Sequence, residues 1–244
     1  MKAERLKEFC ADVLRKLKVP REEAEITADV LVSADLRGIE SHGVSRLPRY
    51  ARRLMNGWIR PEARITVRRE TPVSLLLDAE NSLGQVVAYR AMERCIEKAK
   101  RSHIGFASVT NGNHIGIAGY YAMMALKENM IGLCMTNAWP LVVPTFGIEP
   151  ILGTNPIAFA IPAKHERPFV LDMAASVVPI GKMEVYRRHG KPVPVGWAID
   201  ENGDPALDAE TVMRCVYKSK RGGLLPLGGL EETAGYKGYG LSLL

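Results

Sequence analysis

Short runs of apolar and β-branched residues in the middle of the chain constrain its fold most. They cover residues 105–110, 131–136, 157–161 and 169–172. Runs of this length are typical of strands, and only one segment between them, near residues 120–129, has helical spacing. We therefore expect a mixed α/β fold with a sheet built from this region.

The start of the chain has a different pattern, which predicts helices. Apolar residues recur at helical spacing over residues 6–17, and a second helix is expected over residues 20–38. A third helix is expected over about residues 46–55, where Pro48 is tolerated only in the first turn. This placement makes Ser45 the expected N-cap residue.

Two short strands are expected next, at residues 65–68 and 74–78, followed by an amphipathic helix across residues 86–99. The change from helical to extended patterns indicates a domain boundary. We expect a helical N-terminal region over residues 1–70 and a mixed α/β domain over residues 71–244.

Composition narrows the class of function. The chain has 244 residues, of which 47% are hydrophobic and 25% charged, as in a globular protein with a sizeable core. Its net charge of +6 is scattered along the sequence, which disfavours nucleic acid as a partner and favours an anionic cofactor.

Neither a membrane anchor nor a metal site is expected. No apolar run approaches the roughly 18 residues of a membrane span, and the sequence begins with a charged helix rather than a signal peptide. The four cysteines lie far apart and form no C-x-x-C pair, which predicts reduced thiols and no thiolate zinc site. These observations predict a cytoplasmic protein.

The segment from Glu40 to Arg46 places an imidazole and a guanidinium four residues apart, between two helical patterns. His42 has a side chain that exchanges a proton near neutral pH, and Ser41 could orient its ring. Arg46 could bind a carboxylate through two hydrogen bonds. The alternative is a turn between helices in which the histidine caps the backbone and the arginine is solvated.

A second polar cluster, residues 111–119, lies between an expected strand and an expected helix. Its glycines, Gly112, Gly116 and Gly119, would let a backbone approach an anionic ligand, or they would only relieve backbone strain. They do not form the G-x-G-x-x-G fingerprint, which occurs nowhere in the chain, so an ordinary Rossmann domain is not expected. Asp172 ends an apolar run and would bind a ribose or cap the next segment.

Five motifs occur in a fixed order along the chain, and together they resemble one family. They are Glu40–Gly43 with Arg46, Gly112–His114, Gly153–Pro156, Leu171–Ala174 and Leu225–Gly229. The ordered set resembles the type-2 malate/L-lactate dehydrogenase family, which includes sulfolactate and ureidoglycolate dehydrogenases, over essentially the whole chain. The resemblance implies an NAD- or NADP-dependent oxidoreductase with a non-Rossmann α/β fold, and a homodimer with active sites near the subunit interface.

The resemblance also implies roles for individual residues. Ser41 and His42 match a proton-transfer pair and Arg46 a ligand of the substrate carboxylate, although in some members the histidine matching His114 is the catalytic base. Thr154 and Asn155 match the neighbourhood of a substrate contact. The residues that match cofactor contacts are His114, Ile115, Gly116, Ile117, Ala118, Asp172, Met173 and Ala174. The resemblance further implies that the helical region of residues 1–70 is on the substrate side and that residues 71–244 form the NAD(P)-binding domain.

The function expected from these residues is hydride transfer between NAD(P) and a small 2-hydroxy acid such as malate, lactate or sulfolactate. Family members usually continue past the motif at Lys237–Gly240, so truncation at Leu244 is an expectation, and a catalytically silent nucleotide-binding or scaffold protein is an alternative. A non-redox lyase that uses the same histidine and arginine is a third. The choice between NAD and NADP, and between His42 and His114 as the proton-transfer residue, stays open.

Overall fold

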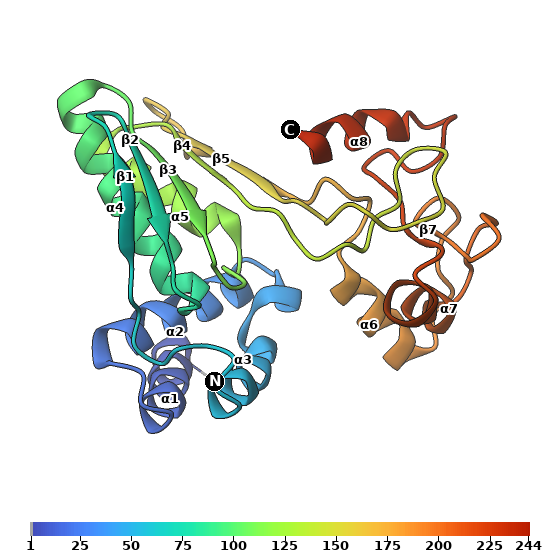
Figure 1. The fold of residues 1–244 in the computed structure, drawn as a ribbon, viewed down its shortest axis with the longest axis horizontal. Coiled ribbons are helices and arrows are strands. Elements are labelled where there is room, and N and C mark those ends of the chain that lie inside the picture. The colour runs from blue at the N-terminus through green and yellow to red at the C-terminus, as the bar shows by residue number, and fades with distance from the viewer. Residues whose placement is uncertain (1) are drawn as a thin grey trace. The chain divides into compact units, whose positions relative to one another are not determined.

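The computed structural model describes residues 2–244, which form two compact units (Figure 1). The first unit contains the chain up to Cys134 together with Phe159–Val170. The second contains Met135–Ala158 and Leu171–Leu244. Both histidines singled out in the sequence belong to the first unit.

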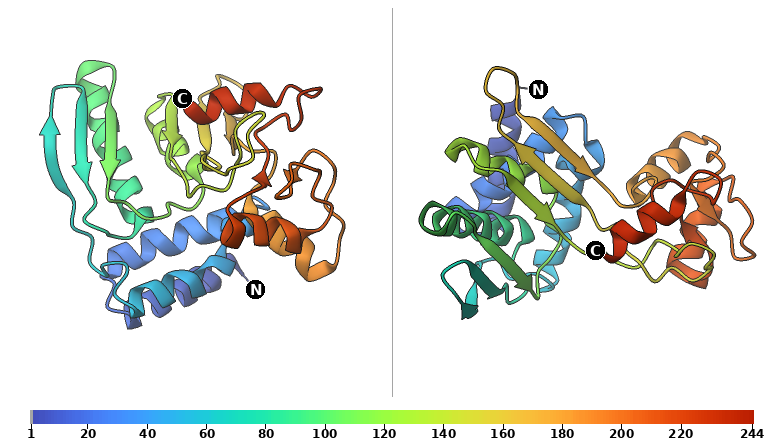
Figure 2. Two further views of the ribbon diagram at one scale, coloured as in Figure 1. Left: turned by 45° about the vertical axis from the view of Figure 1, so that its right-hand side comes forward. Right: turned by 90° about the horizontal axis from the view of Figure 1, so that it is seen from above.

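Helices form the N-terminal part of the first unit, as the sequence predicts. They are α1 (Ala3–Lys16), α2 (Arg21–Leu36) and α3 (Leu47–Met55), and α1 and α2 lie side by side (Figure 2). Their apolar faces share a core that includes Leu14, Leu31 and Tyr50, each no more than 2% exposed. Two 3-10 turns, η1 (Glu40–His42) and η2 (Val44–Arg46), join α2 to α3.

The expected N-cap at Ser45 is wrong. Residues 44–46 already form the turn η2, which continues into α3, so that Arg46 is the residue before the helix and has a helical backbone conformation. A capping side chain needs an extended residue at this point, and none is available. Ser45 instead donates its hydroxyl to the carbonyl of Glu40, at 2.8 Å. Pro48 does lie in the first turn of α3, as expected.

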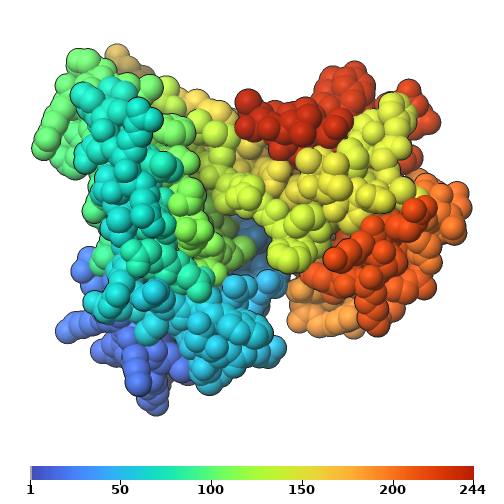
Figure 3. Space-filling model, in the orientation of Figure 1, coloured from blue at the N-terminus to red at the C-terminus, as the bar shows by residue number. Residues whose placement is uncertain are grey.

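The segment that contains His114 follows a three-stranded sheet of order β1-β2-β3. β1 (Thr66–Glu70) is antiparallel to β2 (Ser74–Asp78), whereas β2 is parallel to β3 (Phe106–Thr110). Helix α4 (Gly84–Ser102) connects the parallel pair and covers the face of the sheet that contains Leu75 and Leu77. β1 lies at the surface with all its residues exposed (Figure 3).

The remaining elements complete a mixed α/β fold, which confirms the expected class. α5 (Ala118–Met124) and the 3-10 turn η3 (Ala125–Glu128) follow the first sheet. A second sheet has the order β4-β5-β6, with strands Gly132–Met135, Ile157–Ile161 and Phe169–Met173. The second unit adds α6 (Ile180–His189), β7 (Ala198–Ile199), α7 (Ala209–Arg214), the π turn η4 (Cys215–Ser219), β8 (Gly223–Leu224) and α8 (Gly235–Leu243).

A core of its own stabilises the second unit. Val142, Met183, Val212 and Leu224 are each fully buried within it. The short elements α7, β7 and β8 were not expected from the sequence. Across residues 2–244, no helix combines the length and the apolar character needed to cross a membrane.

Candidate active site

The segment that carries His42 is fixed by a carboxylate from α2. Asp35 accepts a hydrogen bond from the backbone N–H of Val44, at 2.9 Å. The same carboxylate lies directly against Gly43, where an added Cβ would come within 1.8 Å of its Oδ1. Glycine is therefore required at position 43 as long as Asp35 keeps this position, and the turn that presents His42 is tied to the helical core.

The ring of His42 has a partner that suits both of its protonation states. Its Nδ1 lies 2.9 Å from the hydroxyl of Ser41, which can donate to the neutral ring or accept from the charged one. Burial, together with the Arg46 cation, lowers the pKa of His42 to about 4. The guanidinium Nε of Arg46 donates to the carbonyl of Ser41, so the three residues form one hydrogen-bonded group.

The loop that carries His114 lies between β3 and α5 and is fixed through its neighbour Asn113. The amide nitrogen of Asn113 donates to the side chain of Asn81 and to the carbonyl of Ser82, each at 2.9 Å. Its amide oxygen accepts from Arg53 of α3, at 3.1 Å. Gly84, the first residue of α4, packs so closely that a Cβ there would lie 2.2 Å from the carbonyl oxygen of Asn113. The backbone next to His114 is thus held by contacts from α3, α4 and the β2–α4 connection.

The contacts of Nδ1 determine the tautomer of His114. The backbone N–H of Gly116 donates to this nitrogen at 3.2 Å, and because an N–H cannot accept, Nδ1 carries no proton. The hydroxyl of Tyr50 lies 2.6 Å from the same nitrogen and must also donate. The neutral ring therefore carries its proton on Nε2. Gly116 has a φ of +82°, a conformation that favours glycine and directs its N–H back to the ring.

The two rings stack on each other. Their centroids are 5.3 Å apart and their planes differ by 21°. Desolvation lowers the pKa of His114 to about 3, and the neighbouring His42, Arg49, Arg46 and Arg53 act in the same direction. His114 is nevertheless exposed to solvent, so a ligand can reach this residue. Both imidazoles are neutral at pH 7. The proton of His42 can lie on either ring nitrogen, whereas that of His114 is fixed on Nε2.

Tyr50 and Gln85 complete the surroundings of His114. Tyr50 is 2% exposed, and burial raises the pKa of its hydroxyl to about 12, so that it remains a donor. Gln85 is fully buried near Tyr50, and neither end of its amide has a partner that meets normal hydrogen-bond geometry. Neither residue belongs to the motifs that stand out in the sequence. The spacing of four residues from Arg46 to Tyr50 along α3 was the available signal.

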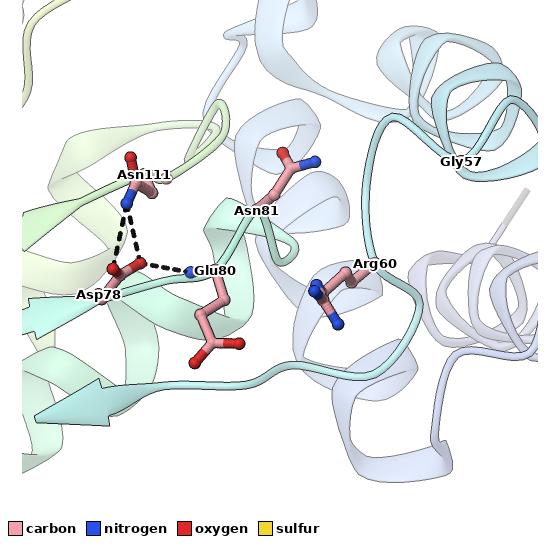
Figure 4. Close-up of a pocket in the computed structure, with 7 residues that line it drawn as sticks. Gly57, Arg60, Asp78, Glu80, Asn81 and Asn111 are labelled. Atoms are coloured by element: carbon pink, nitrogen blue, oxygen red, sulfur yellow. Dashed lines mark hydrogen bonds between the residues drawn. The ribbon is translucent and has the colours of Figure 1, made fainter.

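A polar cavity of about 690 Å³ adjoins this loop (Figure 4). Its lining residues are Gly57, Arg60, Asp78, Glu80, Asn81, Asn111 and Gly112. The carboxylate of Asp78 is already occupied, because it accepts from Arg68, from the side chain of Asn111 and from the backbone N–H of Glu80. These contacts, led by that with Arg68, lower the pKa of Asp78 to about 2. Asp78 therefore supports the loop structure rather than facing a ligand, and Arg60 and Glu80 are the other charged residues of the lining.

The remaining predicted site residues belong to the second unit. The side-chain amide of Asn155 accepts from the backbone N–H of Ala138 at 3.0 Å and donates to the carbonyl of Ser242 at 2.9 Å. Thr154 accepts the N–H of Ala175 through its carbonyl. Asp172 and Met173 end β6, and Ala174 follows them, all partly exposed. Among the described residues, no group of histidine, cysteine and acidic side chains is arranged to hold a metal ion.

The sequence and the fold agree with those of known proteins. The family model for malate/L-lactate dehydrogenase matches residues 1–244, and the chain belongs to this family. Malate dehydrogenase of Pyrococcus horikoshii is 55% identical over 242 residues, which are 99% of this chain and 65% of that protein. L-sulfolactate dehydrogenase of Methanocaldococcus jannaschii is 43% identical over 244 residues, which are all of this chain and 67% of that protein.

Solved structures show the same fold. The crystal structure of malate dehydrogenase from Entamoeba histolytica matches with a TM-score of 0.96 at 41% identity, over all of this chain and 68% of that one. This chain thus spans about two thirds of the length of the relatives that it matches. The expectation of a fold from the malate/L-lactate dehydrogenase family is confirmed.

Proposed function

We propose that this protein is an NAD(P)-dependent dehydrogenase of small 2-hydroxy acids. The observation that carries the proposal is the stacked pair of neutral imidazoles, His42 and His114, beside the guanidinium of Arg46. Oxidation of a 2-hydroxy acid requires a base for the hydroxyl proton, a donor for the developing carbonyl oxygen and a cation for the carboxylate. These three groups supply all of them. Malate and sulfolactate, the substrates named for two relatives, are such acids.

We assign proton transfer to His42. Its ring is neutral and can accept the hydroxyl proton of the substrate, while Ser41 turns its hydroxyl to accept from Nδ1 of the resulting imidazolium. A charged His114 would carry a proton on Nδ1 and point it at the N–H of Gly116, so this ring is suited to donate from Nε2 without changing its charge. Arg46 binds the substrate carboxylate.

A cofactor must complete the reaction, because the side chains around the histidine pair exchange only protons. A bound nicotinamide supplies the hydride acceptor. The residues of the His114 loop fit such a group, since His114 is exposed and Ile115 is partly exposed, while the left-handed glycine at position 116 turns the backbone beneath them. Ile115, Gly116, Ile117 and Ala118 are therefore proposed to hold it, with Asp172, Met173 and Ala174. Thr154 and Asn155 are proposed to lie near the substrate. NAD and NADP are both candidates, and the family resemblance supports a homodimer.

The proposal is tested by mixing the purified chain with NADH or NADPH and a panel of 2-oxo acids, including oxaloacetate, pyruvate and sulfopyruvate. We expect steady oxidation of at least one nucleotide with at least one acid. The reaction is monitored by the absorbance of the reduced nicotinamide. Nucleotide binding without turnover on any acid would instead identify a silent nucleotide-binding protein. Turnover of a hydroxy acid with no nicotinamide present would identify a lyase. Either result overturns the proposal.

A further inference from the structure

One side of helix α3 is densely cationic. With about 100° of rotation per residue, Arg46, Arg49 and Arg53 fall within about 60° of one another around the helix axis, whereas Arg52 lies about 100° from Arg53. The side with Tyr50 faces the histidine site, since Tyr50 contacts His114 and Arg53 contacts its neighbour Asn113. Arg49 and Arg53, in addition to Arg46, are close enough to disfavour the charged form of His114.

The charges of these two arginines are not neutralised within the described residues. Arg49 is exposed and takes part in none of the ion pairs of this part of the chain. Arg53 has the amide oxygen of Asn113 as its partner, and its Nε is buried with no hydrogen-bond acceptor. A buried donor without an acceptor is destabilising by about 1 to 3 kcal/mol. An anion at this place would satisfy the donor and offset the repulsion between the cations.

The electrostatic effect on His114 shows that both arginines act at the site. Arg49 and Arg53 each disfavour the charged form of this imidazole, as Arg46 does. All three also favour the ionised form of the Tyr50 hydroxyl, although burial outweighs them. Groups that act on the same two side chains from one helix would act together on a ligand beside the histidine pair.

We propose that Arg49 and Arg53 form a second anion subsite, which binds the far carboxylate or sulfonate of a dianionic 2-oxo acid. Arg46 binds the carboxylate next to the reacting carbon, as in the proposed function on which this inference rests. Two guanidiniums on one face match the oxygens of a carboxylate or sulfonate through paired hydrogen bonds. The subsite selects a substrate with a second acidic group over one that ends in a methyl group.

The test compares oxaloacetate, a dianion, with pyruvate, a monoanion, in three matched variants. Arg49→Gln and Arg53→Gln each remove one guanidinium of the subsite, and Arg52→Gln removes the same charge from a position about 100° away from Arg53 around α3. We expect the first two to raise KM for oxaloacetate by about tenfold to a hundredfold, as for the loss of a hydrogen bond to a charged group. The kinetics of Arg49→Gln with pyruvate and its KM for NAD(P)H should stay within about twofold of wild type, and Arg52→Gln should leave all three unchanged. Arg53→Gln also loses its bond to Asn113, so it should lose more with oxaloacetate than with pyruvate.

Three outcomes would overturn the subsite. They are an equal loss with oxaloacetate and pyruvate, an effect of Arg52→Gln as large as that of Arg49→Gln, and a rise in the KM for NAD(P)H alone. The last would assign the arginines to a cofactor phosphate. Calorimetric titration with malate keeps the test independent of turnover, because Arg49→Gln should weaken malate binding even if the wild-type chain reduces no 2-oxo acid. In that case the proposed function fails while the subsite stands.

Discussion

The two segments that carry the histidines are held in different ways. The turn at His42 depends on side chains, with Asp35 binding Val44 and the hydroxyl of Ser41 beside the ring. The loop at His114 depends on backbone, since Gly116 donates its N–H to the ring and α4 packs directly on neighbouring carbonyls through Gly84. A hydroxyl can reverse its direction, whereas a backbone N–H can only donate. The same side chain therefore gains a mobile proton in one segment and a fixed proton in the other.

The largest expected effect separates these two roles. His42→Ala removes the proposed base, and we expect kcat to fall by about 10² to 10⁴-fold, the usual contribution of general acid–base catalysis. His114→Gln retains an N–H donor of similar reach, and we expect a loss of only about tenfold, as for a weakened hydrogen bond. Steady-state kinetics in both directions, with stopped-flow measurement of nucleotide binding, gives both values.

Reversed magnitudes would assign the proton to His114 and contradict the tautomer argument. The pH profile gives a second check. In wild type, kcat should fall at acid pH as His42 becomes protonated. This fall should be absent in His42→Ala and persist in His114→Gln. Full activity in both variants would remove the pair from the mechanism.

Much of the fold is predictable from sequence because local rules decide it. The strands at residues 74–78 and 157–161 have the predicted bounds, since runs of apolar residues of this length favour strands. The first turn of α3 accommodates Pro48 for the steric reason used to predict it. The predicted N-cap at Ser45 was wrong because residues 44–46 form a 3-10 turn, whereas an N-cap residue needs an extended backbone. So short a turn has no periodic pattern of apolar residues by which it could be predicted.

The site was predictable only as a set of residues. Ser41, His42 and Arg46 lie close together in the sequence, and in the structure they form one hydrogen-bonded group. The stacking of His42 on His114 depends on packing between α3, α4 and the His114 loop, which no local pattern encodes. The tautomer of His114 depends on a single N–H at Gly116, whose direction follows from a backbone angle.

A smaller effect is expected from adding one methyl group to each segment. Gly84→Ala would place its Cβ against the carbonyls of Asn113 and His114, which are backbone and cannot rotate away, so we expect a loss of about 1 to 3 kcal/mol of stability. Gly43→Ala meets the side chain of Asp35, which can rotate at the loss of its bond to Val44, about 1 kcal/mol. Chemical denaturation followed by circular dichroism measures both.

Two further variants complete this comparison. Gly240→Ala in α8 adds a methyl group where no atom lies within 4 Å, and it should leave stability unchanged or raise it slightly. Combining Gly43→Ala with Asp35→Ala should cost less than the sum of the two single changes, because the obstacle is then absent. Strict additivity would show that Asp35 does not restrict position 43.

The smallest expected effect is the pH dependence of stability. The pKa of His42 is about 4 in the folded chain and 6.5 when unperturbed, so the unfolded state binds more protons between these values. Stability should therefore be full above pH 6.5 and fall as the pH is lowered toward 4. Partial exposure of the ring reduces the contribution to on the order of 1 kcal/mol. We expect His42→Gln to lose less stability than wild type over this range, in denaturation curves at matched pH.

Nuclear magnetic resonance of the ring nitrogens extends the same experiment to the contrast between the two histidines. Above pH 6.5, His114 should show a single form with the proton on Nε2, because Gly116 and Tyr50 both donate to Nδ1. His42 should show both neutral tautomers, since the hydroxyl of Ser41 accommodates either one. A mixture of tautomers at His114 would mean that the N–H of Gly116 does not fix the ring, and the division of roles between the two histidines would fail with it.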